Sequence, residues 1–334
     1  MKSLINVAIV AMSCSFLSCS NSGTQFGLPS MSTQSVGHVT INNKVDILFV
    51  VDNSKSMLQY QQRLAAKVND MIATLNGLGM DYHVAVTTTT MSTNTTTYPM
   101  SRQLVGSPTY LTVSNISQLA NRIIVGEAGS DLERGLDAMR LVTSASYLNS
   151  INSDFLRSDA LFSVVFISDE QDQSSEFGNP NSNDFINYLN SLKPPFENGS
   201  RAWIVNYIGI LTNKSCDNLG GFVSIGTQFI NLVDASKGIK SSICSADLSE
   251  AVSNIKARIV DQLTTFPFAQ TPNKSTVKVS VGGQVIVEDS VNGWTIETET
   301  NAQGKNVSVL KFHGSSIPAA DESVTIDYKP VGAI

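Results

Sequence analysis

Residues 45–57 read V-D-I-L-F-V-V-D-N-S-K-S-M, an apolar run that ends in a cluster of oxygen-bearing side chains. The apolar part is continuous, which is typical of a strand buried on both faces within a parallel sheet. Asp52, Ser54 and Ser56 then follow at alternate positions. Apolar residues recur at helical spacing over residues 58–75. A strand, a polar loop and an amphipathic helix predict a doubly wound α/β fold, in which ligands bind outside the carboxyl ends of the strands.

Two later stretches carry further oxygen donors. Residues 126–131, G-E-A-G-S-D, precede a predicted helix, and Ser130 or Asp131 could serve as its N-cap. The apolar run at residues 161–167 predicts another buried strand, which is followed by S-D-E-Q-D at residues 168–172. Because a doubly wound sheet gathers the loops at the carboxyl ends of its strands, we expect these donors to lie near those of the first stretch.

The Asp-x-Ser-x-Ser motif, followed by these two stretches in this order, resembles the metal-ion-dependent adhesion site of von Willebrand factor type A domains. That module occurs in integrins and in many bacterial surface proteins. The resemblance covers residues 44–265 and implies a mostly parallel, doubly wound sheet. It also implies a metal site formed by Asp52, Ser54, Ser56, Ser130 and Asp169. Ser130 stands where the family has threonine, which keeps the hydroxyl but loses the β-branch that restricts its rotamer.

All five candidate ligands are hard oxygen donors. Such a set favours Mg²⁺, or Mn²⁺ or Ca²⁺, over zinc and copper. Neutral hydroxyls on the ion leave much of its charge unbalanced, so the ion would attract a further carboxylate. The resemblance implies that a partner protein supplies this carboxylate from an Asp or Glu. Glu170 and Asp172 add negative charge around the site, either as solvated loop acids or as part of a second cation site.

The N-terminus has the features of a lipoprotein-type signal peptide over residues 1–18: one lysine, an apolar segment and small residues before a cysteine. Residues 16–19, F-L-S-C, resemble a bacterial lipoprotein processing box, which implies lipidation at Cys19 and attachment to the membrane through that lipid. Cys14 is a competing candidate, and secretion without a lipid is the alternative. Ser20, in place of aspartate after the cysteine, implies an outer-membrane lipoprotein of the bacterial cell envelope, facing either the periplasm or the exterior.

Composition and strand patterns define the segments outside the predicted α/β domain. Residues 19–43 are rich in Ser, Gly, Asn and Thr and predict a tether, in which residues 38–42 could form a short edge strand. Alternating valines with Gly-Gly and Asn-Gly turns predict a small β-rich module over residues 266–334. Cys216 and Cys244 predict a disulfide, since the envelope is an oxidising compartment.

Charge and motifs argue against several functions. The formal charge is −6 and no basic run interleaves with aromatic residues, so nucleic acid is not an expected partner. No nucleophile motif or phosphate loop occurs, and His83 falls within a predicted strand, so an enzyme is not predicted. We therefore expect an adhesion or protein-binding module of the cell envelope that recognises an acidic residue of a partner through the cation. The alternative is a periplasmic scaffold or an assembly subunit of an envelope complex.

Overall fold

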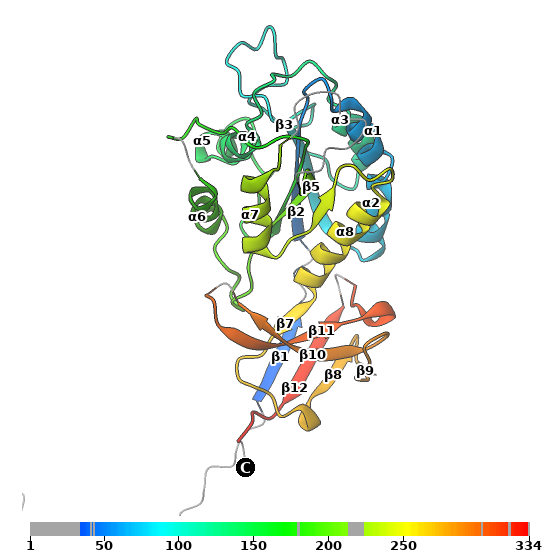
Figure 1. Ribbon diagram of the computed structural model, residues 1–334. Coiled ribbons are helices and arrows are strands. Elements are labelled where there is room, and N and C mark those ends of the chain that lie inside the picture. Colours follow the sequence, from blue (N-terminus) through cyan, green and yellow to red (C-terminus); the bar gives the residue numbers. More distant parts are fainter. Residues whose placement is uncertain are drawn as a thin grey trace, which may run out of the picture. The chain divides into compact units, whose positions relative to one another are not determined.

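The computed structural model describes residues 34–40, 42, 44–178, 181–212, 224–301, 303–319 and 322–332 (Figure 1). The predicted signal peptide, with Cys14 and Cys19, lies outside the described residues, as does Cys216. Cys244 is disulfide-bonded, and its pairing with Cys216 stays a prediction. In the described part of the chain, no helix is both long and apolar enough to cross a bilayer.

Five parallel strands form the central sheet in the order β3-β2-β4-β5-β6. The strands are β2 (Lys44–Val51), β3 (Asp81–Thr88), β4 (Leu161–Ser168), β5 (Trp203–Gly209) and β6 (Lys240–Ser242). Every residue of β4 and β5 is buried, as is all of β2 except Lys44. Such burial requires that other elements pack on both faces of the sheet. The near-continuous apolar runs of these strands predict this arrangement. The α/β class is thus observed as a parallel sheet flanked by helices.

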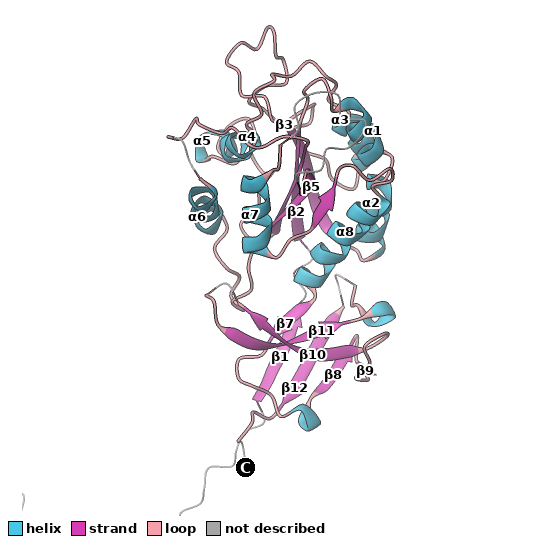
Figure 2. Cartoon of the chain, in the orientation of Figure 1, coloured by secondary structure: helices cyan, strands magenta, loops and turns pink. Residues whose placement is uncertain are grey.

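Helices cover both faces of this sheet (Figure 2). One face carries α1 (Leu58–Ala65), α2 (Val68–Gly77), α3 (Leu119–Ile123), which follows the 3-10 turn η1 (Ile116–Gln118), and α8 (Ser249–Leu263). The other face carries α4 (Gly135–Val142), α6 (Ser182–Leu192) and α7 (Thr227–Ser236), with the short α5 (Ala145–Leu148) after α4. Side chains of β2 alternate between the two cores: Phe49 and Val51 pack into the first, Leu48 and Val50 into the second.

The order of the strands reverses between β2 and β4. The chain passes from β2 to β3 on one side, and then returns to place β4 on the other side of β2. The backbone N–H of Asp52 donates to the carbonyl of Ile167 at 3.0 Å, so the two strands are still joined where their loops begin. In open α/β sheets, such a reversal at the carboxyl ends of the strands is where ligands bind.

Two antiparallel sheets are formed by other parts of the chain, in the orders β1-β12-β8-β9 and β10-β11-β7. Their strands are β1 (Gln34–Thr40), β7 (Thr265–Pro267), β8 (Lys278–Val281), β9 (Gln284–Ile286), β10 (Trp294–Thr300), β11 (Asn306–Phe312) and β12 (Ser323–Tyr328). Two 3-10 turns connect strands along the chain: η2 (Lys274–Thr276) precedes β8, and η3 (Gly314–Ser316) precedes β12. Trp294, Leu310 and Ile326 belong to a core that is separate from those of the parallel sheet.

Residues 34–40 lie within the predicted tether but form a strand of the β-rich part, which is longer and begins earlier than the edge strand that the sequence allowed at residues 38–42. This strand, β1, pairs antiparallel with β12, while β8 pairs with the other edge of β12 (Figure 1). Without β1, one edge of β12 would expose its backbone N–H and C=O groups, which pairing satisfies. The chain therefore contributes a strand to this sheet before it enters the parallel sheet.

A buried ion pair lies at the amino end of β2. Asp46 is fully buried, and its carboxylate accepts hydrogen bonds from the backbone N–H of Arg157 at 2.6 Å and from its Nε at 2.9 Å. Burial raises the pKa of Asp46, and Arg157 opposes that shift. The carboxylate is therefore stable in this position because Arg157 compensates its charge.

Replacing Arg157 with alanine is expected to lower the free energy of unfolding by about 3–5 kcal/mol, because Asp46 would stay buried without its partner. Lys44→Ala is the control. The pair of Lys44 with Asp159 has side chains 37% and 60% exposed, and such surface pairs contribute about 0–1 kcal/mol. Urea unfolding of both variants measures the difference, and equal losses would contradict the special role of Arg157.

Candidate functional site

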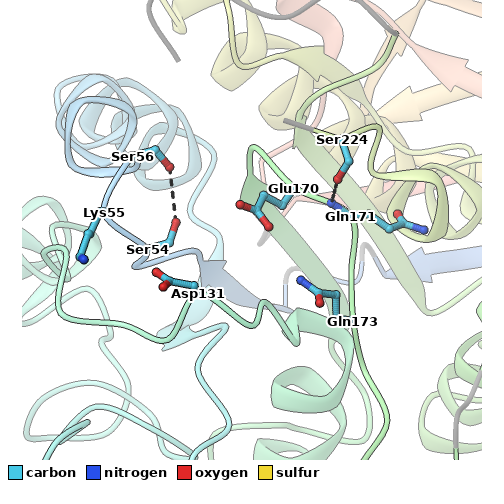
Figure 3. Close-up of a pocket in the computed structure, with 8 residues that line it drawn as sticks. All are labelled: Ser54, Lys55, Ser56, Asp131, Glu170, Gln171, Gln173 and Ser224. Carbon is cyan, nitrogen blue, oxygen red and sulfur yellow. Dashed lines mark hydrogen bonds between the residues drawn. The ribbon is translucent and has the colours of Figure 1, made fainter. Parts of the chain in front are cut away.

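The loop after β2 is organised by the carboxylate of Asp52. Asp52 Oδ1 accepts a hydrogen bond from the backbone N–H of Ser54 at 2.9 Å, and Oδ2 accepts one from Ser168 Oγ at 2.7 Å. Asp52 is fully buried and Ser54 is 5% exposed. The hydroxyl oxygens of Ser54 and Ser56 lie 3.4 Å apart (Figure 3). Asp52 thus fixes the turn that brings the two hydroxyls together.

Asp169 follows β4 directly and lies beside this loop. Its side chain is buried, and its Oδ1 has no hydrogen-bond partner among the described residues. Burial raises the pKa of Asp169, and the neighbouring Ser56 hydroxyl opposes the shift. Burial and then the charge of Asp169 raise the pKa of Asp52 as well. A buried carboxylate oxygen without a donor is costly, so this is a position at which a cation would be stabilising.

The predicted segment at residues 126–131, which together with residues 132–134 is called the third loop below, lies against the loop after β2 through its backbone. The N–H of Gly129 donates to the carbonyl of Asn53 at 2.8 Å, and the N–H of Ser130 donates to Thr90 Oγ1 at 3.0 Å. The Ser130 hydroxyl accepts a hydrogen bond from the N–H of Leu132 at 3.1 Å. The structure therefore brings Asp52, Ser54, Ser56 and Asp169 together. Within the described residues, no hydrogen bond joins the Ser130 hydroxyl to those four side chains.

Gln61 in α1 is a residue of the site that the sequence analysis missed. It is fully buried, and its Nε2 donates to the carbonyl of Asp52 at 2.9 Å and to that of Gly126 at 2.8 Å. Its Oε1 accepts from the N–H of Gly126 at 3.0 Å. Gln61 thus holds the first and third loops together. The signal in the sequence was an amide on the apolar face of a predicted helix, next to Tyr60.

Glu133 is a second missed residue. It is fully buried, and neither carboxylate oxygen has a hydrogen-bond partner among the described residues. Its own carbonyl accepts from the N–H of Gln173 at 2.7 Å, and the N–H of Arg134 donates to the carbonyl of Thr89 at 3.0 Å. Burial, followed by the charge of Asp52, raises the pKa of Glu133. The sequence places it in the first turn of a predicted helix, where an acid is ordinary, whereas α4 begins only at Gly135.

Asp172 is not one of the acids around the site, contrary to the sequence-based expectation. It is buried, and its carboxylate accepts from the N–H groups of Leu136 at 3.0 Å and Ser174 at 3.1 Å. Asp172 therefore accepts a hydrogen bond from a free backbone N–H in the first turn of α4, a helix that begins at Gly135, four residues after Asp131. Glu170 is only partly buried, and burial, followed by the charges of its acidic neighbours, raises its pKa to about 7.

A cavity of about 650 Å³ opens over the loops (Figure 3). It is lined by Ser54, Lys55, Ser56, Asp131, Glu170, Gln171, Gln173 and Ser224. Glu170 lies opposite Ser54 in the close-up view, and the N–H of Gln171 donates to Ser224 Oγ at 2.8 Å. A ligand in this cavity would reach the Ser54 and Ser56 hydroxyls from outside the domain.

The residues present fit a hard divalent cation. The donors are hydroxyl and carboxylate oxygens, and Asp169 Oδ1 is a buried acceptor without a donor. Within the described part of the chain, no three Asp, Glu, His or Cys side chains are placed to hold a metal ion by themselves. A cation here would therefore depend on the serine hydroxyls, with some carboxylates acting through water, as Mg²⁺ sites commonly do.

Comparison with known proteins gives no family. No family model and no curated protein matches the chain. Among solved structures, proximal thread matrix protein 1 from the mussel byssus is 14% identical over 69% of this chain and 51% of its own, with a TM-score of 0.41.

Two bacterial pilus adhesins also match. SpaC from Lactobacillus rhamnosus GG, in its open conformation, is 12% identical over 85% of this chain and 38% of its own, with a TM-score of 0.41. RrgA from Streptococcus pneumoniae is 10% identical over 89% of this chain and 58% of its own, with a TM-score of 0.35. The chain thus spans between 38% and 58% of the length of these three structures.

The contact of Gly129 with the first loop predicts a sensitive position. A Cβ at Gly129 would overlap the backbone and side-chain oxygens of Asn53, so Gly129→Ala is expected to cost about 1–3 kcal/mol of stability. Gly77→Ala is the matched control, because a Cβ there meets nothing within 4 Å. Urea unfolding compares the variants with the wild type. Wild-type stability in Gly129→Ala would show that the two loops are not closely packed.

Proposed function

We propose that this protein is an adhesion or protein-binding module of the von Willebrand factor type A kind, with a divalent cation at a metal-ion-dependent adhesion site. One observation carries the proposal: the Ser54 and Ser56 hydroxyls, 3.4 Å apart, lie at the switch point of the sheet and line an open cavity. Beside them, Asp169 Oδ1 is buried without a donor among the described residues. This combination favours a cation that is buried on one side and accessible on the other.

The proposed cation is Mg²⁺, or Mn²⁺ or Ca²⁺, held by Ser54, Ser56 and Asp169, with Asp52 orienting the loop. Ser130 is the remaining ligand that the sequence predicts. The bound ion would supply positive charge at the floor of the cavity. An Asp or Glu carboxylate of a partner protein would bind to that charge, and Lys55 at the cavity wall would add to the attraction. Affinity would then come from the ion, and specificity from the residues around the cavity.

The place of action that fits this proposal is the bacterial cell envelope. The predicted signal peptide and lipidation at Cys19 would anchor the protein to the membrane, most directly the outer membrane. The N-terminal strand β1 pairs within the β-rich part, so that part would be the first folded structure after the tether.

Asp169→Ala is expected to weaken Mg²⁺ and Mn²⁺ binding at least about tenfold, because it removes a carboxylate of the site. Glu170→Ala is the matched control from the next position, and it is expected to bind both ions nearly as the wild type does, since Glu170 only lines the cavity. Calorimetric titration of the three proteins measures the affinities. Equal affinity in all three would mean that Asp169 does not hold the ion.

Partner recognition is expected to require both the cation and carboxylates on the partner. Pull-downs would use the wild type in Mg²⁺, the wild type in chelator, and an Asp52→Ala, Ser54→Ala double variant in Mg²⁺. A specific partner is retained only by the first. Amidation of the carboxylates of that purified partner should abolish rebinding, whereas acetylation of its lysines should not. A partner that rebinds after amidation would contradict recognition through an acidic residue.

A further inference from the structure

We propose that Glu133, rather than Ser130, is the residue of the third loop that holds the divalent cation. The inference rests on the proposed function, because it concerns the same site. It assigns a ligand that the sequence resemblance does not imply.

The backbone around Glu133 is fixed between two other loops of the site. Its carbonyl accepts from Gln173 in the loop after β4, at 2.7 Å. The next N–H, that of Arg134, donates to Thr89, and the N–H of Thr89 donates to the carbonyl of Val51 at 3.2 Å. Val51 is the residue before Asp52. Glu133 is thus held next to the carboxyl ends of both β2 and β4, the strands that carry the other ligands.

Buried polar atoms without partners concentrate around this position. Seven buried side-chain oxygens have no hydrogen-bond partner among the described residues, and four of them belong to Thr89, Glu133 and Asp169. The charges of Asp52, Asp169 and Glu170 all act on the Glu133 carboxyl group, which places it within reach of the site. Buried polar groups in folded proteins are almost always satisfied. A cation bound here would provide a partner for the Glu133 carboxylate and for Asp169 Oδ1.

Ser130, in contrast to Glu133, is neither fully buried nor without a hydrogen-bond partner. It is only partly buried, and its hydroxyl accepts a hydrogen bond from the N–H of Leu132 at 3.1 Å. Its backbone N–H is bonded to Thr90 Oγ1 at 3.0 Å. These contacts account for Ser130 as part of the turn. The Glu133 carboxylate makes no hydrogen bond of normal geometry with a described residue, although the nearby Thr89 hydroxyl opposes the rise of its pKa.

A glutamate in this role changes the charge of the site. Asp52 and Asp169 balance the charge of a divalent ion, and Glu133 adds one negative charge more. Because no three carboxylates of the described residues are placed to hold an ion by themselves, at least one of them would act through water. The extra carboxylate favours binding of the cation before the partner arrives. It also admits Ca²⁺, which accepts more oxygen ligands than Mg²⁺ does.

Calorimetric titration with Mg²⁺ and with Ca²⁺ tests the assignment on Glu133→Gln, Ser130→Ala and the neighbouring control Asp131→Asn. Loss of a residue that holds or supports a metal costs about 10–100-fold in affinity, and we expect a loss of that size only in Glu133→Gln. The other two variants are expected to stay close to the wild type. Wild-type affinity in Glu133→Gln, or a loss confined to Ser130→Ala, would overturn the inference.

Thermal unfolding separates loss of the ligand from loss of the fold. In chelator, Glu133→Gln is expected to be at least as stable as the wild type, because glutamine has nearly the same shape and brings no charge into the buried position. Added Ca²⁺ should raise the melting temperature of the wild type but not of Glu133→Gln. If Glu133→Gln gains as much from Ca²⁺ as the wild type does, Glu133 does not hold the ion.

The outcomes distinguish this inference from the proposed function. If Asp169→Ala loses the cation and Glu133→Gln keeps it, the inference fails and the proposed function stands. If Glu133→Gln loses the cation and the partner of the wild type rebinds after amidation of its carboxylates, the inference stands and the proposed partner chemistry fails. No binding of either ion to the wild type would overturn both.

Discussion

The fully buried carboxylate of Asp52 is the group on which the site depends. Its two oxygens are bonded to the first loop and to Ser168 at the end of β4, so a single side chain joins the two central strands where they end. Its carbonyl is held in turn by Gln61, which also binds the third loop. A charge buried in this way is tolerated only where hydrogen bonds compensate it. The loops are therefore arranged around Asp52.

The parallel sheet supplies the rigidity that such a site requires. The side chains of β2 pack alternately into two cores, and helices cover both faces, so the carboxyl end of the strand cannot shift without disturbing both. The loops are linked to one another by single backbone hydrogen bonds, such as those of Gly129 with Asn53 and of Gln173 with Glu133, and by the side chain of Gln61. The packed sheet thus fixes the positions of the hydroxyls and carboxylates that follow its strands. The loops between them leave the cavity open to a ligand.

Much of the fold and part of the site could be predicted from the sequence. The apolar runs of β2, β4 and β5 predicted strands buried on both faces, because only a covered parallel strand can be apolar at every position. The oxygen donors after β2 and β4 were predicted to meet, since parallel strands end at one edge. The strand β1 was less clear, because an edge strand is stabilised by the backbone of β12 and leaves little mark in its own side chains.

The sequence by itself determined the class of the sheet, its central strands and the chemical nature of the donors that follow them. Only the tertiary structure decided which polar side chains are buried and what satisfies them. Asp172, which looked like a loop acid, caps α4. Glu133, which looked like an ordinary acid in the first turn of a helix, is buried without a hydrogen-bond partner among the described residues. Burial and hydrogen bonding depend on segments far apart in the chain, such as Glu133 with Gln173. Local patterns report periodicity, but they do not report what a side chain meets once distant loops have come together.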